Sequence, residues 1–238
     1  MKKSFLRTLT VIVFTCLFVS VLAVVFASAA ETKTVSDSDF SSIIMNVGAD
    51  ETQRNLTFYS TLKGNGEIRY GKSTNGALPA SYSVAKAIRS ATSKPGYYSF
   101  KATLTGLEEN TTYVYTIVVG DKESLPRTFR VGEMGDSFSF AFVTDVQVGS
   151  SSESALWQDT FQKMNASFPN TSFVISAGDQ TSDASRESDF DYFIIPELAG
   201  LAVSTTVGPP HDNSMRYAEH YNLPNLSSSY GVSATSSD

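Results

Sequence analysis

The pattern of apolar residues changes near residue 136, and this change limits the chain to two differently built regions. Before it, runs rich in β-branched and aromatic residues are separated by turn signals such as "GNG", "KPG" and "EEN". About ninety residues of this kind predict a small antiparallel β-sandwich. Tyr113 and Tyr115 share one face of their strand, which predicts core positions. The clearest strands are expected over 55–61, 66–71, 97–107 and 111–120.

The region after "GEMGD" (132–136) predicts an α/β arrangement. Ser150 with Glu153 is a capping box, which marks the start of the first expected helix. Alternating strands and helices imply parallel strands joined by crossovers. The sequence therefore predicts an all-β sandwich followed by a partial α/β domain. Its strands are expected over 137–145, 171–179 and 202–208, and its helices over 151–168 and 185–201.

Polar residues follow each of the three expected parallel strands. Asp145 comes after the first strand, Asp179 after the second, and the pair His211-Asp212 after the third. The carboxyl ends of parallel strands meet at one edge of a sheet, which is where ligands bind. Carboxylates with a nearby histidine suit a divalent metal ion.

The first thirty residues predict a secretory signal peptide. Basic residues precede an apolar run from about Leu9 to Phe26, and "ASAA" supplies small residues before Glu31. This interpretation predicts a secreted protein. The apolar run approaches the ~20 residues that span a bilayer, so the alternative is an uncleaved N-terminal membrane anchor.

The remaining chain of about 208 residues is acidic and contains no cysteine. Its 15 Lys and Arg oppose 24 Asp and Glu, a net charge of −9, which argues against nucleic acid and anionic membrane surfaces as partners. Without thiolates, any metal ion must be held by oxygen and imidazole ligands.

Five motifs resemble a known family. "FAFVTDVQVG", "FVISAGDQTSD" and "TTVGPPHDN" resemble, in order, the first three motifs of calcineurin-like metallophosphoesterases. "IRYGKS" and "ATLTGLEENTTYVYTIVVG" resemble the fibronectin type III-like N-terminal domain of purple acid phosphatases. The resemblance implies a metal-dependent hydrolase of phosphate esters. The expected organisation is a signal peptide (1–30), the N-terminal domain (38–131), a partial catalytic domain (137–226) and a polar, disordered tail (227–238).

The resemblance also assigns roles to single residues. It makes Asp145 a ligand of the first metal, places Gln147 where many relatives have a second ligand, and makes Asp179 the carboxylate that bridges two metals. His211 corresponds to the histidine that contacts the phosphate and assists the leaving group, and Asp212 to the acidic residue after it. The family's centre is dinuclear, which implies Fe, Zn or Mn.

The departures from the family pattern predict an incomplete metal site. Ser182 stands where a tyrosine binds iron, and Pro209 and Pro210 stand where an asparagine ligand is expected. No histidine follows His220, whereas the family's later motifs supply three. Two or three oxygen ligands without imidazole are more typical of a loose Mg²⁺ or Ca²⁺ site. We therefore expect a truncated phosphatase with little or no activity.

Two other interpretations remain open from the sequence. The chain could be a non-catalytic extracellular binding module built on the β-sandwich, or its reading frame could be broken downstream of Asp238. His220 is expected at the surface, and Asp183 is expected to be a loop carboxylate rather than a metal ligand.

Overall fold

The computed structural model describes residues 33–133, 135–206 and 211–225. The expected signal peptide, the tail 227–238 and the prolines Pro209 and Pro210 lie outside these ranges. Within them, no helix combines the length and the apolar content needed to cross a membrane.

Residues 34–131 form a β-rich region of mostly antiparallel strands. One group pairs β4 with β5 and β7, and β7 with β8 and β9; the other pairs β3 with β2 and β6. The predicted β-rich character of this region is confirmed. The strands are β1 (Thr34–Val35), β2 (Ser41–Val47), β3 (Arg54–Ser60), β4 (Gly66–Lys72), β5 (Ser83–Ala91), β6 (Tyr98–Leu104), β7 (Thr111–Val119), β8 (Lys122–Glu123) and β9 (Arg127–Val131), with a short 3-10 helix η1 (Asp37–Asp39) before β2.

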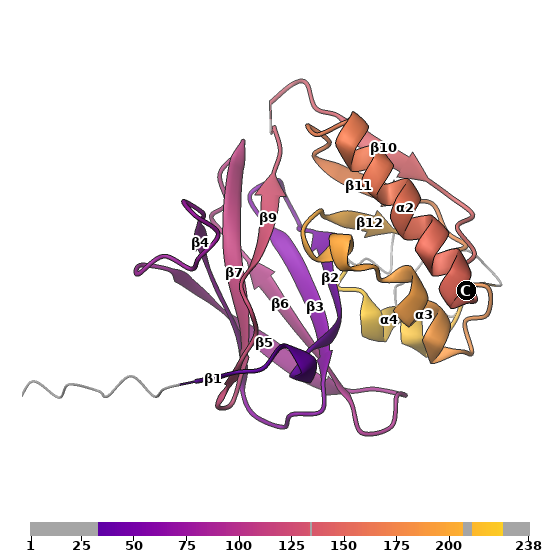
Figure 1. Cartoon of the computed structure of the whole chain (residues 1–238), viewed down its shortest axis with the longest axis horizontal. Helices are drawn as coiled ribbons and strands as arrows, with labels where there is room; N and C mark the ends of the chain where they lie inside the picture. Colours follow the sequence, from indigo (N-terminus) through magenta and orange to yellow (C-terminus); the bar gives the residue numbers. More distant parts are fainter. Residues whose placement is uncertain (1–32, 134, 207–210, 226–238) are drawn as a thin grey trace, which may run out of the picture. The chain divides into compact units, whose positions relative to one another are not determined.

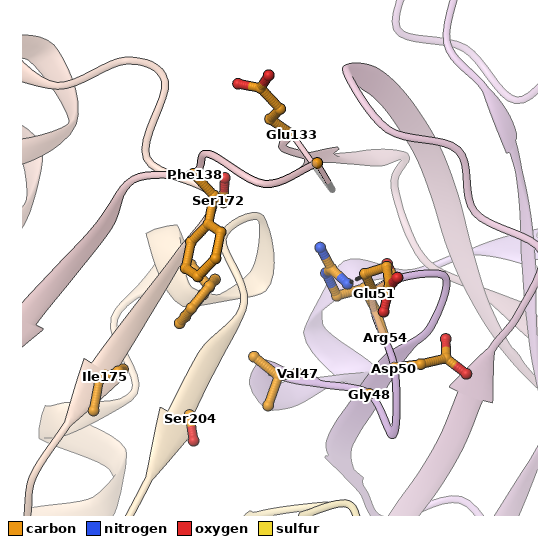
Figure 2. A pocket seen from close by; sticks show the side chains of 12 residues that line it. Val47, Gly48, Asp50, Glu51, Arg54, Glu133, Phe138, Ser172, Ile175 and Ser204 are labelled. Atoms are coloured by element: carbon orange, nitrogen blue, oxygen red, sulfur yellow. Dashed lines mark hydrogen bonds between the residues drawn. The ribbon is translucent and has the colours of Figure 1, made fainter.

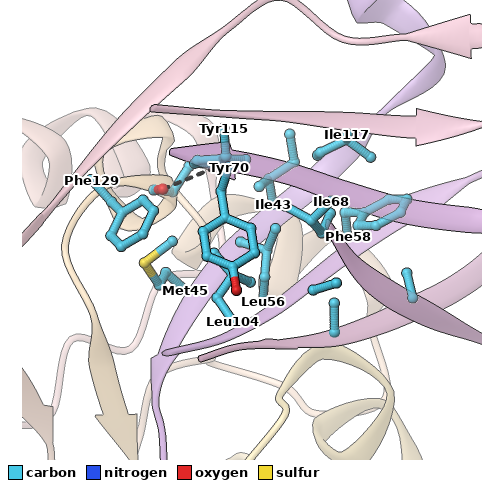
Figure 3. Packing of buried hydrophobic residues seen from close by; sticks show 14 of the residues in the cluster. Ile43, Met45, Leu56, Phe58, Ile68, Tyr70, Leu104, Tyr115, Ile117 and Phe129 are labelled. Carbon is cyan, nitrogen blue, oxygen red and sulfur yellow. Dashed lines mark hydrogen bonds between the residues drawn. The ribbon is translucent and has the colours of Figure 1, made fainter. Parts of the chain in front are cut away.

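Strand β5 joins the two groups of strands. Its residues 83–87 pair with β4, and its residues 88–91 pair with β6. Side chains from both groups pack into one core (Figure 3). In this core the Phe58 and Phe100 rings stack at 4.9 Å. Tyr113 and Tyr115 are buried in this core, which confirms their predicted position.

The later strands form a parallel sheet with helices in the connections. β10 (Phe140–Val143), β11 (Phe173–Ser176) and β12 (Val203–Thr205) pair in that order. The first connection holds α2 (Ser151–Ser167), the second holds α3 (Glu187–Phe193) and the 3-10 helix η2 (Pro196–Ala199), and α4 (Met215–His220) follows β12.

The prediction of one helix over 185–201 is wrong, because the structure has the shorter helix α3 followed by the 3-10 helix η2. Pro196 disfavours a helical conformation at Ile195 and lacks a backbone N–H, so α3 ends at Phe193. The predicted start of α2 is confirmed, because the Ser150 hydroxyl accepts the Glu153 N–H at 3.3 Å.

The two faces of the parallel sheet differ in what covers them. Helices α2 and α3 cover one face (Figure 1). On this face the Trp157 and Phe193 rings stack at 5.7 Å. On the other face, Phe140 stacks on Phe173 at 5.6 Å and keeps 49% of its surface exposed, while Phe142 keeps 62%. This second face therefore leaves a sizeable aromatic area uncovered by the described residues.

Strand β2 connects the parallel sheet to the β-rich region. β12 pairs with β2 at Val203 and Asn46, and the Asn46 side chain donates to the Val203 carbonyl at 3.0 Å. The Asn222 N–H in turn donates to the Asn46 side-chain oxygen at 2.9 Å. By their internal contacts, the described residues form one compact unit. The domain boundary at 132–136 stays a prediction.

Helix α4 and the residues after it dock against β3 and β6. His220 stacks between Tyr59 of β3 and Phe190 of α3 and is fully buried. The prediction that His220 lies at the surface is therefore wrong. Lys101 of β6 donates to the Ala218 carbonyl and, at 2.7 Å, to the Tyr221 carbonyl.

Lys101 should give the protein a stability that rises with pH between about 8 and 10. Burial lowers the pKa of Lys101 from 10.5 to about 8, a shift that the charge of Glu219 opposes only in part. In this window the unfolded chain binds more protons than the folded one, so the free energy of unfolding increases, on the order of 1–2 kcal/mol. Near pH 10 an opposite effect offsets this rise, because burial raises the pKa of Tyr59, Tyr115, Tyr217 and Tyr221 above its ordinary value and unfolding lets them ionise.

Urea unfolding at pH 8, 9 and 10 measures this slope. Lys101→Met should remove the rise between pH 8 and 10, whereas Lys86→Met, at an exposed position of β5, should keep it. If the free energy of unfolding changes equally with pH in the wild type and in both variants, Lys101 is not the cause of the rise.

Candidate functional site at the carboxyl edge of the parallel sheet

The loops that follow β10 and β11 run side by side at the carboxyl edge of the sheet. The Asp145 N–H donates to the Gly178 carbonyl at 3.2 Å, and the Gln147 N–H donates to the Asp179 carbonyl at 2.8 Å. The structure thus brings together the two loops that carry the three expected metal ligands. Parallel pairing of β10 with β11 is what places them there.

All three expected metal ligands have a left-handed backbone. Their φ angles are 61° for Asp145, 45° for Gln147 and 52° for Asp179. They are three of the six non-glycine residues with positive φ in the part of the chain that the structure describes. This conformation costs on the order of 1 kcal/mol per residue, and such strain concentrates at functional sites.

The side chains of these residues are only partly assembled. Gln147 donates from Nε2 to the Asp179 Oδ2 at 3.3 Å, and both side chains are half-buried. Asp145 is exposed and makes no hydrogen bond to either of them within the described ranges. Gln147 and Asp179 therefore form a pair, with Asp145 beside them on the same pair of loops.

Ser182 and Gly149 let the two loops approach closely. The Ser182 hydroxyl donates to the Gln147 carbonyl at 2.6 Å. A Cβ added at Gly149 would lie 2.8 Å from the Ser182 Oγ, so this close approach requires glycine. Ser182, at the position where the resemblance places a tyrosine, thus has a structural role that the sequence did not indicate.

His211 and Asp212 attach the third loop to the second. The His211 Nδ1 lies 3.0 Å from the Ser182 carbonyl oxygen, and the ring is half-buried. Asp212 is fully buried, and its Oδ1 accepts the N–H groups of Gln180 at 2.8 Å and Thr181 at 3.0 Å. The Asp212 carboxylate is therefore placed to hold two loops together, while His211 is the member of the pair that reaches the surface.

Arg186 is a charged residue near this edge that the sequence analysis did not select. Its guanidinium pairs with Asp189 at 2.8 Å and lies 3.6 Å from Asp183, and it packs beside Gly149. Two hydrogen bonds from Ser185 lower the pKa of Asp183, in keeping with its predicted role as a loop carboxylate. Nothing in the sequence pattern distinguishes Arg186 from an ordinary surface arginine.

The described residues do not fit a dinuclear metal centre. Among them, no three His, Cys, Asp or Glu side chains are grouped so that they could hold a metal ion. The Gln147 amide already donates to one oxygen of Asp179, and His211 is turned to a backbone carbonyl. The oxygen donors that remain are suited to a hard cation rather than to a pair of tightly held transition metals.

Comparison with known proteins identifies the β-rich region. Residues 40–141 match the family model of the purple acid phosphatase N-terminal domain. Asp145, Gln147, Asp179 and His211 lie outside the matched residues. No curated protein matches the chain.

Two solved structures are similar to this chain. One is purple acid phosphatase PPD1 from yellow lupin (Lupinus luteus) seeds, with 12% identity and a TM-score of 0.57 over 71% of this chain and 35% of that one. The other is PhoD, with 13% identity and a TM-score of 0.42 over 70% of this chain and 37% of that one. At such identity the lupin enzyme shows a shared fold alone. The chain spans about a third of the length of that phosphatase.

Proposed function

We propose that this chain, which carries the N-terminal domain of a purple acid phosphatase, belongs to a secreted metal-dependent phosphoric-ester hydrolase. In this proposal residues 38–131 are a fibronectin type III-like sandwich and residues 137–226 are part of a metallophosphoesterase catalytic domain. Secretion rests on the signal-type sequence of residues 1–30.

One observation supports the proposal for the residues that follow the matched N-terminal domain. Asp145, Gln147 and Asp179 sit in left-handed conformations on adjoining loops at the carboxyl edge of parallel strands. These are the positions that the motif resemblance assigns to metal ligands. A backbone that holds two carboxylates and an amide in this costly geometry supports a ligand-binding ancestry for the edge.

Within this edge the residues have different proposed roles. Asp145 and Asp179 supply oxygen ligands to a single hard cation, and His211 contacts the phosphate of a phosphate ester. Asp212 is a positioning residue, because its carboxylate holds the His211 loop against the residues after β11. Hydrolysis needs more metal ligands than the described residues supply, so we expect little or no activity from this chain.

Titration with Mn²⁺ tests the proposed cation site. We expect weak, saturable binding by isothermal titration calorimetry, because carboxylate oxygens are suitable ligands for Mn²⁺. Asp179→Asn should weaken the binding about tenfold, which corresponds to roughly 1.4 kcal/mol. Asp183→Asn is the matched control: it removes one charge from a neighbouring loop whose carboxylate bonds to Ser185, and binding should be unchanged.

Two results would contradict this assignment. If Mn²⁺ does not bind, or if Asp183→Asn weakens binding as much as Asp179→Asn, the edge is not the cation site. An aryl phosphate assay tests the expected lack of activity separately. Hydrolysis that a chelator and Asp179→Asn both abolish would mean that the chain holds a complete catalytic centre.

A further inference from the structure

A cavity of about 420 Å³ lies between the β2–β3 turn and the face of the parallel sheet that the helices leave uncovered. Its size falls within the range of small-molecule sites, roughly 300–1,000 Å³. Val47, Phe138, Phe173 and Ile175 supply apolar walls. In Figure 2, Arg54 lies on the side of the cavity formed by the β2–β3 turn, with Phe138 and Ile175 on the opposite side.

Arg54 is a buried cation in the wall of this cavity. Only 6% of its surface is exposed. Its Nη1 donates to the carbonyls of Glu51 at 3.1 Å and Gln53 at 2.6 Å, but its Nε is buried and has no hydrogen-bond partner among the residues the structure places. No ion pair with a carboxylate involves Arg54 within those residues. A guanidinium keeps its charge at all ordinary pH values, so this site has a buried charge that lacks a counter-ion.

A second buried polar atom in the same wall also lacks a partner. The Ser172 hydroxyl, just before β11, is buried and makes no hydrogen bond in the described part of the chain. Buried polar groups are normally hydrogen-bonded, so unsatisfied atoms of this kind require an explanation. Here the two unsatisfied atoms are a cationic N–H donor and a hydroxyl, and both belong to residues that line one cavity.

The acidic residues near the cavity do not neutralise Arg54. Asp50 accepts hydrogen bonds from Thr52 and Gln53 of its own turn. Figure 2 shows the Asp50 and Glu133 side chains directed away from the cavity. Together with Glu51 they give the rim a negative charge, which repels a dianion such as phosphate more strongly than a monoanion.

We propose that this cavity binds a small organic monocarboxylate with an apolar body. The carboxylate pairs with the Arg54 guanidinium in the cavity wall, and the apolar body packs between Val47 and the side chains of Phe138, Phe173 and Ile175. Charge-assisted hydrogen bonds to guanidinium favour carboxylates, and the aromatic walls favour an aryl or alkyl group. The cavity shares no residue with the carboxyl edge, so the proposal does not depend on the proposed phosphoesterase function.

Titration of the full chain with 4-phenylbutyrate and its neutral amide tests the proposal. We expect the acid to bind at least tenfold more tightly than the amide in isothermal titration calorimetry. Arg54→Met keeps the length and apolar character of the side chain and should lower the affinity for the acid to that for the amide. Arg89→Met removes an exposed arginine of β5 and should leave both affinities unchanged.

A cavity-filling variant and a direct spectroscopic signal complete the test. Ile175→Trp should prevent binding of both compounds, and it keeps the test decisive if Arg54→Met does not fold. The Arg54 Nε–H resonance, identified by its loss in Arg54→Met, should move when the acid is added but not when the amide is added. Absence of saturable binding, equal affinities for acid and amide, or acid binding that survives both Arg54→Met and Ile175→Trp would each overturn the proposal.

Discussion

Replacing Asp212 by alanine is expected to lower the free energy of unfolding by about 3 kcal/mol, because two buried backbone N–H groups lose their acceptor. Those groups belong to Gln180 and Thr181, both fully buried, and they donate to the Asp212 Oδ1. A buried donor left without a partner costs roughly 1–3 kcal/mol. Urea unfolding followed by the fluorescence of Trp157, the single tryptophan of the chain, measures the change.

Two control variants separate the hydrogen bonds from the loss of charge. Asp212→Asn keeps an oxygen acceptor at the same place and should lose no more than about half as much stability. Asp183→Ala removes a carboxylate whose side-chain bonds go to Ser185 in its own loop, and should cost less than about 1 kcal/mol. If Asp212→Ala is as stable as the wild type, the carboxylate does not hold the loops, and its positioning role is wrong.

From the sequence, only the loops of the candidate site could be predicted, because each of them follows the end of a parallel strand. Asp145 and Asp179 follow parallel strands, and that is enough to place their loops side by side. The burial of Asp212 was not predictable, because its hydrogen-bond partners lie about thirty residues away in the chain. A polar pair after an apolar strand is compatible with either a surface loop or a buried acceptor, and only the tertiary structure distinguishes them.

The same limit explains the errors in the predicted fold. Local patterns were sufficient for the β-rich region and for the start of α2, where the capping residues are neighbours in the sequence. Strand β2 was not singled out, although its centre is an apolar run, Ile43–Met45. That run is buried on both faces of β2, because Ile43 and Met45 pack in the core of the β-rich region and Ile44 packs in the core beneath the helices. His220 stands in the polar stretch "RYAEHYNLP", and its burial depends on Tyr59, far away in the chain.

Replacing His220 by alanine should destabilise the protein by about 4 kcal/mol, because the ring is a fully buried contact between the β-rich region and the helices. It stacks on Tyr59 at 4.4 Å with 9° between the ring planes, and on Phe190 at 5.0 Å with 13°. Its Nε2 lies 3.0 Å from the Glu187 Oε1. Truncation of a buried ring leaves a cavity and typically costs about 3–5 kcal/mol. The same fluorescence-detected urea unfolding measures the loss.

His220→Phe separates the stacking from the hydrogen bond. Phenylalanine keeps a flat ring between Tyr59 and Phe190 and loses only the contact with Glu187, so we expect a loss of about 1–2 kcal/mol. Met215→Ala, at a position of α4 that is 75% exposed, is the matched control and should stay within about 0.5 kcal/mol of the wild type. A loss in His220→Ala no larger than in Met215→Ala would contradict the prediction.

A double-mutant cycle with Tyr59 then asks whether α4 and β3 stabilise each other. If His220 acts through its stack on Tyr59, the losses in His220→Ala and Tyr59→Leu should not add, with a coupling energy of about 1 kcal/mol or more. Additive losses would mean that His220 stabilises only the helices around it. Coupling would mean instead that α4 and β3 stabilise each other through this contact, so that the β-rich region supports the helix that follows the third loop.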